Sequence, residues 1–460
     1  MRKAGVQMAT VRLTEGNVWG TIVRFAVPFL LANLFQALYG AADLFMVGRF
    51  SDSAGVSAVA TGGQVMQTIT GLAVGLTTGG TVLIGRHYGA RQGRQTADAV
   101  KTALVLFGLL SLAMMAGTLW LLDEICAMMQ VPHQALESTR AYLYICALGI
   151  PAIMDYNAVS AILRGLGDSH TPLLFIAVAC AGNIALDFYL VGIRDLGAPG
   201  AAIATVMAQT ASLALIGLYL WRRGNLRQYR RKRPQLRAAA ARQMLAAGLP
   251  IAVQDGLVNV SFLILTALIN HMGLTESASV GVVEKLIVFS MLPTTAIASA
   301  IAAITAQHLG AGCMARARRC LEAGIFLALV FGVACFAAAQ LAAPALVGLF
   351  SSDPQVIETG GWYLRAYSFD CVLVCFVFCL NTYFSGGGHP VFPLVHSLIS
   401  TVLVRIPLSW YLSRLPQADL FHIGFAAPLA SLVSLGLCAA YLWRSVRQER
   451  LSGLLRADMD

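Results

Sequence analysis

Two aspartates and two neutral polar residues, all set in long apolar stretches, carry the most specific chemistry in this sequence. Asp43 interrupts the apolar residues 19–47, and Asp187 follows Asn183 by four residues in another apolar stretch. Because an α-helix turns once every 3.6 residues, this spacing puts Asn183 and Asp187 on one helix face. Thr205 lies in the next apolar stretch. A buried carboxylate costs several kcal/mol unless it is paired, protonated or hydrated, so both aspartates are candidate functional residues.

A pocket shared by two carboxylates predicts cation binding. Two acids in poorly hydrated surroundings cannot both remain ionised at low energy, and a proton or Na⁺ would relieve their repulsion. Hard cations favour oxygen ligands, so Asn183 and Thr205 would complete the site. We therefore predict a cation-coupling site in which Na⁺, if it is the ion, contacts Asp43, Asp187 and Asn183. The alternative role for Asn183 and Thr205 is hydrogen bonding between helices, worth about 0.6 kcal/mol each.

Composition identifies the elements that must position these residues as membrane-spanning helices. The 460 residues are 58% hydrophobic and only 12% charged, with a mean hydropathy of +0.72, and a soluble domain would carry about twice that charged fraction. No cleavable signal is expected, because the first apolar stretch is too long for a signal core. Hydropathy predicts twelve spans: 19–47, 57–84, 99–122, 141–163, 172–191, 200–221, 246–271, 278–306, 321–349, 360–384, 391–413 and 424–444.

Basic residues predict the orientation of these spans, because Lys and Arg favour cytoplasmic loops. With both termini cytoplasmic, the cytoplasmic segments hold 24 of the 32 Lys and Arg residues and the external segments hold five. Asp43 and Asp187 then lie four or five residues from the outer ends of their spans, and Thr205 about five from the outer start of its span. All three therefore sit roughly 6 to 8 Å below the outer boundary. We expect these side chains to meet.

The two halves of the chain repeat each other at an offset of 221 or 222 residues. The segment 87–90 (HYGA) corresponds to 308–311 (HLGA), and 219–222 (YLWR) corresponds to 441–444 (YLWR). Six spans per copy give both copies the same orientation, as in parallel repeats that enclose a cavity. We predict an all-α membrane protein with two six-helix lobes related by a pseudo-two-fold axis along the membrane normal. Residues 1–221 form the N-lobe, 222–245 a basic cytoplasmic linker and 246–460 the C-lobe.

Two further features concern motion and charge within the spans. Pro28 lies about ten residues into the first span and removes a backbone hydrogen bond, so it is a candidate hinge. A static kink, repeated at Pro250, is the alternative.

Glu284, Lys285 and Arg405 are predicted to form structural ion pairs, because buried charges are normally paired.

Several segments together resemble the multidrug and toxic compound extrusion (MATE) transporters. They are residues 36–49 around Asp43, residues 85–90 (GRHYGA), and residues 163–168 (LRGLGD) with Pro172. The twelve-span, two-lobe layout agrees, so the resemblance covers almost the whole chain. It implies a secondary antiporter that exports bulky cationic or amphiphilic compounds in exchange for H⁺ or Na⁺ by alternating access.

The resemblance also implies roles for particular residues. In the DinF-like branch of the family, which this chain resembles, the N-lobe cation cluster includes an Asn on the fourth span, and Asn157 matches it. The NorM-like branch keeps cation-site carboxylates in the C-lobe, which makes Asp370 and Asp255 a possible second cation site. Expected partners are a drug-like small molecule, the coupling cation and membrane lipids, but no cofactor and no nucleic acid. We expect a monomer in the bacterial inner membrane.

Two alternative functions remain open at this point. A lipid-linked oligosaccharide flippase of the same superfamily would have similar lobes, but such flippases tend to carry more cavity cations than the few that this chain has at membrane depth. An intramembrane prenyltransferase is a remote alternative suggested by residues 183–187 (NIALD). That enzyme needs a second acidic motif for Mg²⁺, and the corresponding stretch of the other half, which begins at Ser409, contains no acid.

Overall fold

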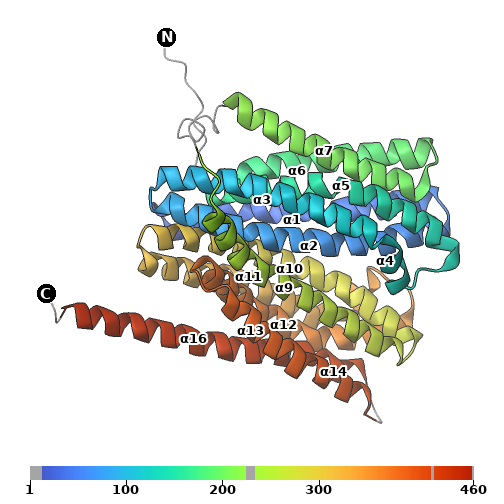
Figure 1. Cartoon of the computed structure of the whole chain (residues 1–460). Coiled ribbons are helices and arrows are strands. Elements are labelled where there is room, and N and C mark those ends of the chain that lie inside the picture. The colour runs from blue at the N-terminus through green and yellow to red at the C-terminus, as the bar shows by residue number, and fades with distance from the viewer. Residues whose placement is uncertain (1–12, 224–233, 416–418, 458–460) are drawn as a thin grey trace. The chain divides into compact units, whose positions relative to one another are not determined.

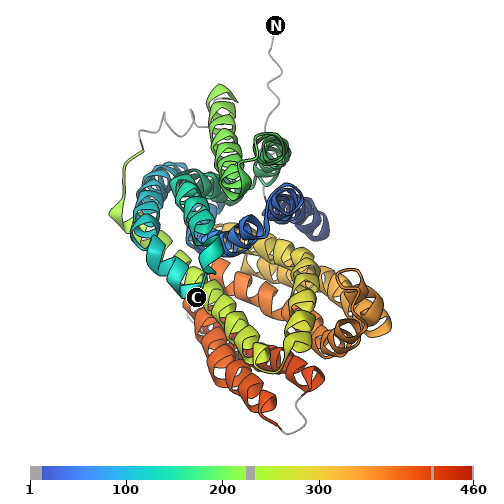
Figure 2. The same cartoon turned by 90° about the vertical axis from the view of Figure 1, so that its right-hand side faces the viewer.

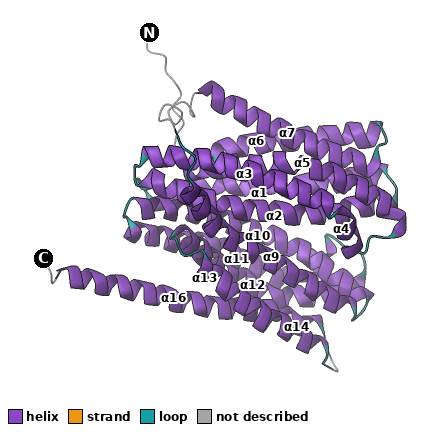
Figure 3. Ribbon diagram, viewed as in Figure 1, coloured by secondary structure: helices purple, strands orange, loops and turns teal. Residues whose placement is uncertain are grey.

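The computed structural model describes residues 13–223, 234–415 and 419–457. Every regular element in these ranges is a helix (Figure 3). Twelve of the helical segments are long and apolar enough to cross a membrane. The predicted all-α class with twelve spans is therefore confirmed.

The helices extend beyond most of the spans predicted from hydropathy, because polar residues continue the helical turns past the apolar core (Figure 1). In the first half the elements are α1 (Val18–Phe50), α2 (Ser53–Gly89), α3 (Gly93–Trp120), α4 (Leu122–Met128), α5 (His133–Gly165), α6 (His170–Asp187), η1 (Phe188–Ile193) and α7 (Gly197–Arg223). In the second half they are α9 (Ala238–Asn270), α10 (Leu274–Gly310), α11 (Met314–Gly348), α12 (Pro354–Gly386), α13 (Val391–Leu398), η2 (Ile399–Arg405), α14 (Ile406–Ser413), α15 (Leu420–Gly424) and α16 (Ala426–Ala457).

Local sequence explains where several helices begin and where their geometry changes. The side chains of Asn17 and Asp52 accept hydrogen bonds from the first turns of α1 and α2, which satisfies backbone donors that no helical carbonyl can reach. Two spans contain π-helical segments: η1 follows α6 directly, and η2 separates α13 from α14. Such wider turns are often found at functional sites. Hydropathy carries no signal for them.

Contacts divide the chain into two compact units. The first comprises the described residues up to Gly256, with Ala302–Cys320 and Gly386–Gly388, and the second comprises Leu257–Ile301, Leu321–Ser385 and the described residues from His389 onward. Helices α9 and α10 each contribute to both units, whereas the repeat predicted a lobe boundary in the linker 222–245. Residues 238–245 of that predicted linker are helical, as the start of α9. The lobe boundaries taken from the repeat stay a prediction.

A reciprocal glycine contact joins the ends of α2 and α10 within the first unit. A Cβ atom on Gly89 would lie 2.0 Å from the carbonyl oxygen of Gln307, and one on Gly310 would lie 1.9 Å from the carbonyl oxygen of Arg86. The pairs match through the repeat, because Gly89 corresponds to Gly310 and Arg86 to Gln307 at an offset of 221. Only glycine lets the two backbones approach this closely.

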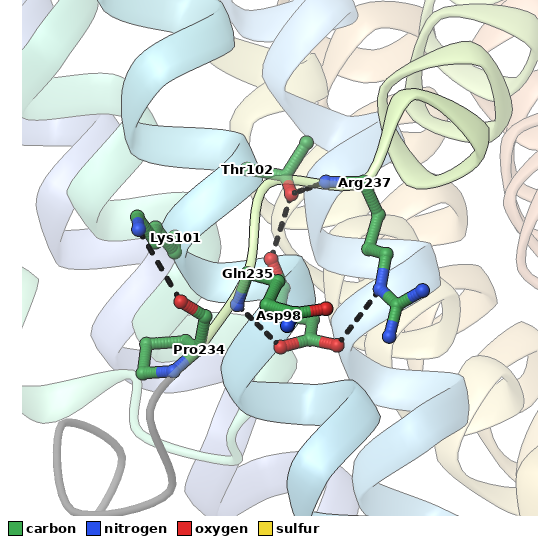
Figure 4. A network of polar contacts seen from close by, with 6 residues as sticks. All are labelled: Asp98, Lys101, Thr102, Pro234, Gln235 and Arg237. Carbon is green, nitrogen blue, oxygen red and sulfur yellow. Dashed lines mark hydrogen bonds and ion pairs between the residues drawn. The ribbon is translucent and has the colours of Figure 1, made fainter.

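An ion-pair network fixes the start of α9 against α3 (Figure 4). The buried carboxylate of Asp98 accepts hydrogen bonds from the backbone N–H of Gln235 at 2.8 Å and from Nε of Arg237 at 3.2 Å. Thr102 Oγ1 accepts the backbone N–H of Arg237 at 3.2 Å, and Lys101 Nζ donates to the carbonyl oxygen of Pro234 at 3.2 Å. A buried carboxylate is tolerated here because it has a cationic partner and a backbone donor.

The substitution Gly89→Ala tests the reciprocal contact. The added methyl group meets a backbone carbonyl that cannot rotate away, so we expect a loss of about 1–3 kcal/mol in unfolding free energy. The measurement is the thermal midpoint of the detergent-solubilised protein. Gly117→Ala in α3 is the matched control, because its Cβ would meet no atom within 4 Å, and its thermal midpoint should be unchanged or higher. Equal midpoints for both variants would contradict the contact.

The substitution Asp98→Asn tests the network on α3. It leaves Arg237 without an ionic partner, and we expect a loss of about 1–2 kcal/mol, measured as a lower thermal midpoint. The control is Asp123→Asn, which removes an exposed ion pair with Arg140 and should cost about 0–1 kcal/mol. A midpoint for Asp98→Asn no lower than that of the control would show that the network does not stabilise the first unit.

Candidate functional site

Helices α1, α6 and α7 of the first unit pack together (Figures 1 and 2). They bring four polar side chains to one place. Asp43 of α1 is 4% exposed, and Asn183 and Asp187 of α6 are fully buried. Because α6 stays α-helical through Asp187, these last two residues occupy the same face, one turn apart. Thr205 enters from α7. These residues define the acidic cluster.

Hydrogen bonds from two helices hold the Asp43 carboxylate. Asn183 Nδ2 donates to Asp43 Oδ1 at 3.0 Å, and Thr205 Oγ1 donates to Asp43 Oδ2 at 2.9 Å. The Asn183 amide also lies 3.3 Å from Thr205 Oγ1. Each Asp43 oxygen therefore has one donor, which replaces part of the hydration that the carboxylate loses on burial.

The Asp187 carboxyl group lies beside that of Asp43 but has no donor of its own. The two carboxyl groups are close enough to interact electrostatically. Both Asp187 oxygens and Asn183 Oδ1 are buried, and no donor among the described residues reaches them. An ionised carboxylate cannot donate, so the two acids can be bonded to each other only if a proton lies between them. The cluster therefore presents three unsatisfied oxygens in a site with two acidic groups.

The oxygens of this cluster fit a proton or a hard cation. Na⁺ and similar ions bind carboxylate and amide oxygens, and buried oxygens without donors supply such ligands at no loss of existing hydrogen bonds. Among the described residues, no group of three or more His, Cys, Asp and Glu side chains is placed to bind a metal ion. A transition-metal site of that composition is therefore not found in this part of the chain.

Tyr39 is a neighbour of the cluster that sequence reasoning did not select as a site residue. Its hydroxyl donates to the backbone carbonyl of Thr205 at 3.4 Å, and its buried ring packs near Cys180 and Ala208. The spacing in the sequence could have indicated this residue, because Tyr39 lies four residues before Asp43 and therefore on the same face of α1.

Asn157 is placed apart from the hydrogen bonds of the cluster. It is buried on α5, and its amide donates to the carbonyl oxygen of Ile153 in its own helix at 2.9 Å. The resemblance assigned Asn157 to the cation site, but the structure gives it no hydrogen bond to the acidic cluster within the described residues.

Pro28 lies inside α1, which continues as one helix on both sides of it, so its role as a hinge stays a prediction.

The possible second cation site is divided between the two units. Asp370 is buried on α12 in the second unit, and its Oδ1 has no hydrogen-bond partner among the described residues. Asp255 is exposed on α9 and belongs to the first unit. A second cation site made of Asp370 and Asp255 stays a prediction.

The structural ion pairs predicted for Glu284, Lys285 and Arg405 are not formed. Glu284 accepts a hydrogen bond from Thr266 Oγ1 at 3.2 Å. No salt bridge joins any of the three to an acid or base within the described residues. The sequence placed all three residues in one lobe, but it could not predict whether their side chains face one another.

Comparison with known proteins identifies the family. The family model MatE matches residues 28–189 and 250–411, so the second match begins and ends 222 residues after the first. The chain is 25% identical over 459 residues to "Probable multidrug resistance protein YoeA" of Bacillus subtilis (strain 168), covering 96% of this chain and 98% of that protein.

Solved structures share the fold across almost the whole chain. One is described as the outward-facing conformation of a multidrug resistance MATE family transporter of the MOP superfamily, with a TM-score of 0.87 and 22% identity over 96% of this chain and 98% of that one. Two others are described as MATE in the straight and in the bent conformation, each with a TM-score of 0.88 and 21% identity over 97% and 99% of the respective chains.

These matches bear on the alternatives that the sequence left open. The intramembrane prenyltransferase is wrong, because the match is to a transporter family, and the oligosaccharide flippase is not favoured. The matches include both halves of the chain, each at the same place in its copy. The chain therefore belongs to the MatE family of multi-pass membrane transporters.

Proposed function

We propose that the chain is a cation-coupled multidrug efflux antiporter, which exports bulky cationic or amphiphilic compounds by alternating access. A relative of nearly the same length is named a probable multidrug resistance protein. The observation that supports coupling is the acidic cluster, in which Asp43 and Asp187 share a buried place and no basic group bonds to either carboxylate among the described residues. The coupling ion is H⁺ or Na⁺.

The hydrogen bonds of the cluster give the two acids different roles. Asn183 and Thr205 donate to Asp43 and stabilise its ionised form, whereas Asp187 has no donor. An incoming proton bridges the two carboxyl groups, or Na⁺ binds the Asp187 oxygens and Asn183 Oδ1. Either ion removes one net negative charge from a buried site, which lowers the energy of closing the helices around it. Loss of that ion restores the repulsion and favours separation of α1 from α6 and α7.

Pro28 links this charge change to the shape of α1. Asp43 lies about four helical turns after Pro28 on the same helix. Pro28 has no N–H to donate to the carbonyl oxygen of Arg24, so bending at this point breaks one hydrogen bond fewer than elsewhere. Relatives of the same fold are described in straight and bent conformations. We assign Pro28 as the hinge through which the acidic cluster changes the exposure of the drug path.

The proposed function also includes the orientation, the membrane, the branch of the family and the oligomeric state. The bias of basic residues supports cytoplasmic termini, and the bacterial relative supports the cytoplasmic (inner) membrane of a bacterium. The composition of the acidic cluster supports the DinF-like branch. A monomer suffices, because all four residues of the cluster come from one chain.

The substitution Asp43→Asn tests the coupling. It keeps the size of the side chain but removes the charge, so we expect gradient-driven export to fall at least tenfold while the protein remains folded. The measurement is efflux of ethidium from proteoliposomes, driven separately by a proton gradient and a sodium gradient. Asp155→Asn is the control, because Asp155 is a half-buried acid on α5 outside the cluster. Unchanged export by Asp43→Asn would remove Asp43 from the mechanism, and export that needs neither gradient would refute coupling.

The substitution Pro28→Ala tests the hinge. Alanine restores the missing backbone donor, so α1 should become stiffer and the protein more stable by up to about 3 kcal/mol. We expect export to fall at least tenfold with a higher thermal midpoint, both measured on the same preparation. The matched control is Pro250→Ala, at the corresponding position of α9, which should retain export within about twofold. Wild-type export by Pro28→Ala would show that α1 need not bend there.

A further inference from the structure

Arg405 is a buried cation in the second unit that the proposed coupling mechanism does not use. It is the last residue of η2, within the span Val391–Ser413, and only 9% of its surface is exposed. Its guanidinium carbon lies 4.0 Å from the centre of the Phe262 ring, and Nη1 donates to Ser261 Oγ at 3.2 Å. The stacked ring and this hydrogen bond fix the plane of the guanidinium.

The free edge of this guanidinium has the geometry of an anion-binding fork. Nε and Nη2 are fully buried and have no acceptor among the described residues. These two N–H groups point the same way, which is the arrangement that binds a carboxylate or phosphate through two parallel hydrogen bonds. Ser409 lies one turn further along the same segment, and its buried Oγ also lacks a partner. Three unsatisfied polar atoms therefore lie on one side of the span.

Nearby acids do not neutralise Arg405 by direct contact. Asp370 and Glu284 are within its electrostatic range, but neither forms a salt bridge with it in the described part of the chain. Glu284 is hydrogen-bonded to Thr266. Leaving buried donors unsatisfied costs about 1–3 kcal/mol for each group, and more where the group is charged. Such a loss is tolerated where a ligand supplies the missing acceptors.

The repeat relates this place to the acidic cluster. At the offset of 222 shared by both ends of the family match, Arg405 corresponds to Asn183 and Ser409 to Asp187. At the same offset, apolar Leu265 replaces Asp43, and it is buried in the core of the second unit. The second copy thus has a base and a hydroxyl group where the first copy has an amide and an acid. Both places adjoin a π-helical segment.

We propose that Arg405 and Ser409 form a binding subsite for the carboxylate or phosphate group of an amphiphilic anion. The Arg405 fork binds two oxygens of the anion, and the Ser409 hydroxyl donates to one of them. This inference rests on the proposed efflux function and extends its substrates to molecules that carry a negative group.

Binding of an anionic probe tests the subsite without requiring transport. The probe is carboxyfluorescein, and its binding to the purified full chain in detergent is followed by fluorescence anisotropy. We expect Arg405→Gln to weaken binding at least tenfold, Arg405→Lys to weaken it less because the charge remains without the fork, and Ser409→Ala to weaken it about threefold. The matched control is Arg414→Gln, which removes an exposed arginine stacked on Trp410 and should bind as the wild type does.

Ethidium, a cationic probe, separates a subsite from a purely structural role. Arg405→Gln should leave ethidium binding within twofold, whereas equal loss of both probes would show that Arg405 serves only to balance Asp370 and would overturn the proposal. If Arg405→Gln does not fold, Arg405→Lys and Ser409→Ala decide, and unchanged carboxyfluorescein binding by both overturns the subsite. Arg405-dependent anion binding without gradient-driven ethidium export would refute the efflux proposal alone. Ethidium export by a protein that does not bind carboxyfluorescein would refute the subsite alone.

Discussion

The constraint on which this structure depends is the hydration that Asp43 loses when α1 packs into the first unit. Asn183 and Thr205 replace that hydration with one hydrogen bond to each oxygen of Asp43. Because the donors come from α6 and α7, the carboxylate sets the distance and rotation of three helices at once. Asp187 adds a second carboxyl group to the same buried place, and no donor among the described residues reaches it.

The two copies of the repeat show how one framework can carry opposite chemistry. In the first copy, the face of α6 presents an amide and an acid near Asp43. In the second copy, the corresponding positions hold Arg405, which stacks on an aromatic ring, and Ser409, whose hydroxyl lacks a partner among the described residues. Each copy has six spans, and the fifth span of each contains a π-helical segment, although the two segments do not fall at equivalent positions. A few side chains at corresponding positions differ in charge between the copies. Function here resides in the site rather than in the fold.

Hydropathy and helical rise predicted much of this architecture. The twelve spans followed from apolar length, and the common depth of Asp43, Asp187 and Thr205 followed from counting residues to the ends of the spans. The depth of a residue in the membrane depends on its position along the helical backbone and can therefore be predicted from the sequence. The rotation of a helix about its axis depends on tertiary packing, which explains why Asn157 bonds to its own helix and why Glu284 pairs with Thr266 instead of Lys285. The π-helical segments and the Phe262 stack on Arg405 have no periodic signal at all.

The reciprocal contact between Gly89 and Gly310 has a consequence for how a duplicated sequence can evolve. Elsewhere the copies have diverged, as Asn183 and Arg405 show. At this crossing each glycine is held by the main chain of the other copy, so a larger residue in one cannot be accommodated by a side-chain change in the other. Residues that are identical in both copies should therefore persist longest where the two copies are in contact.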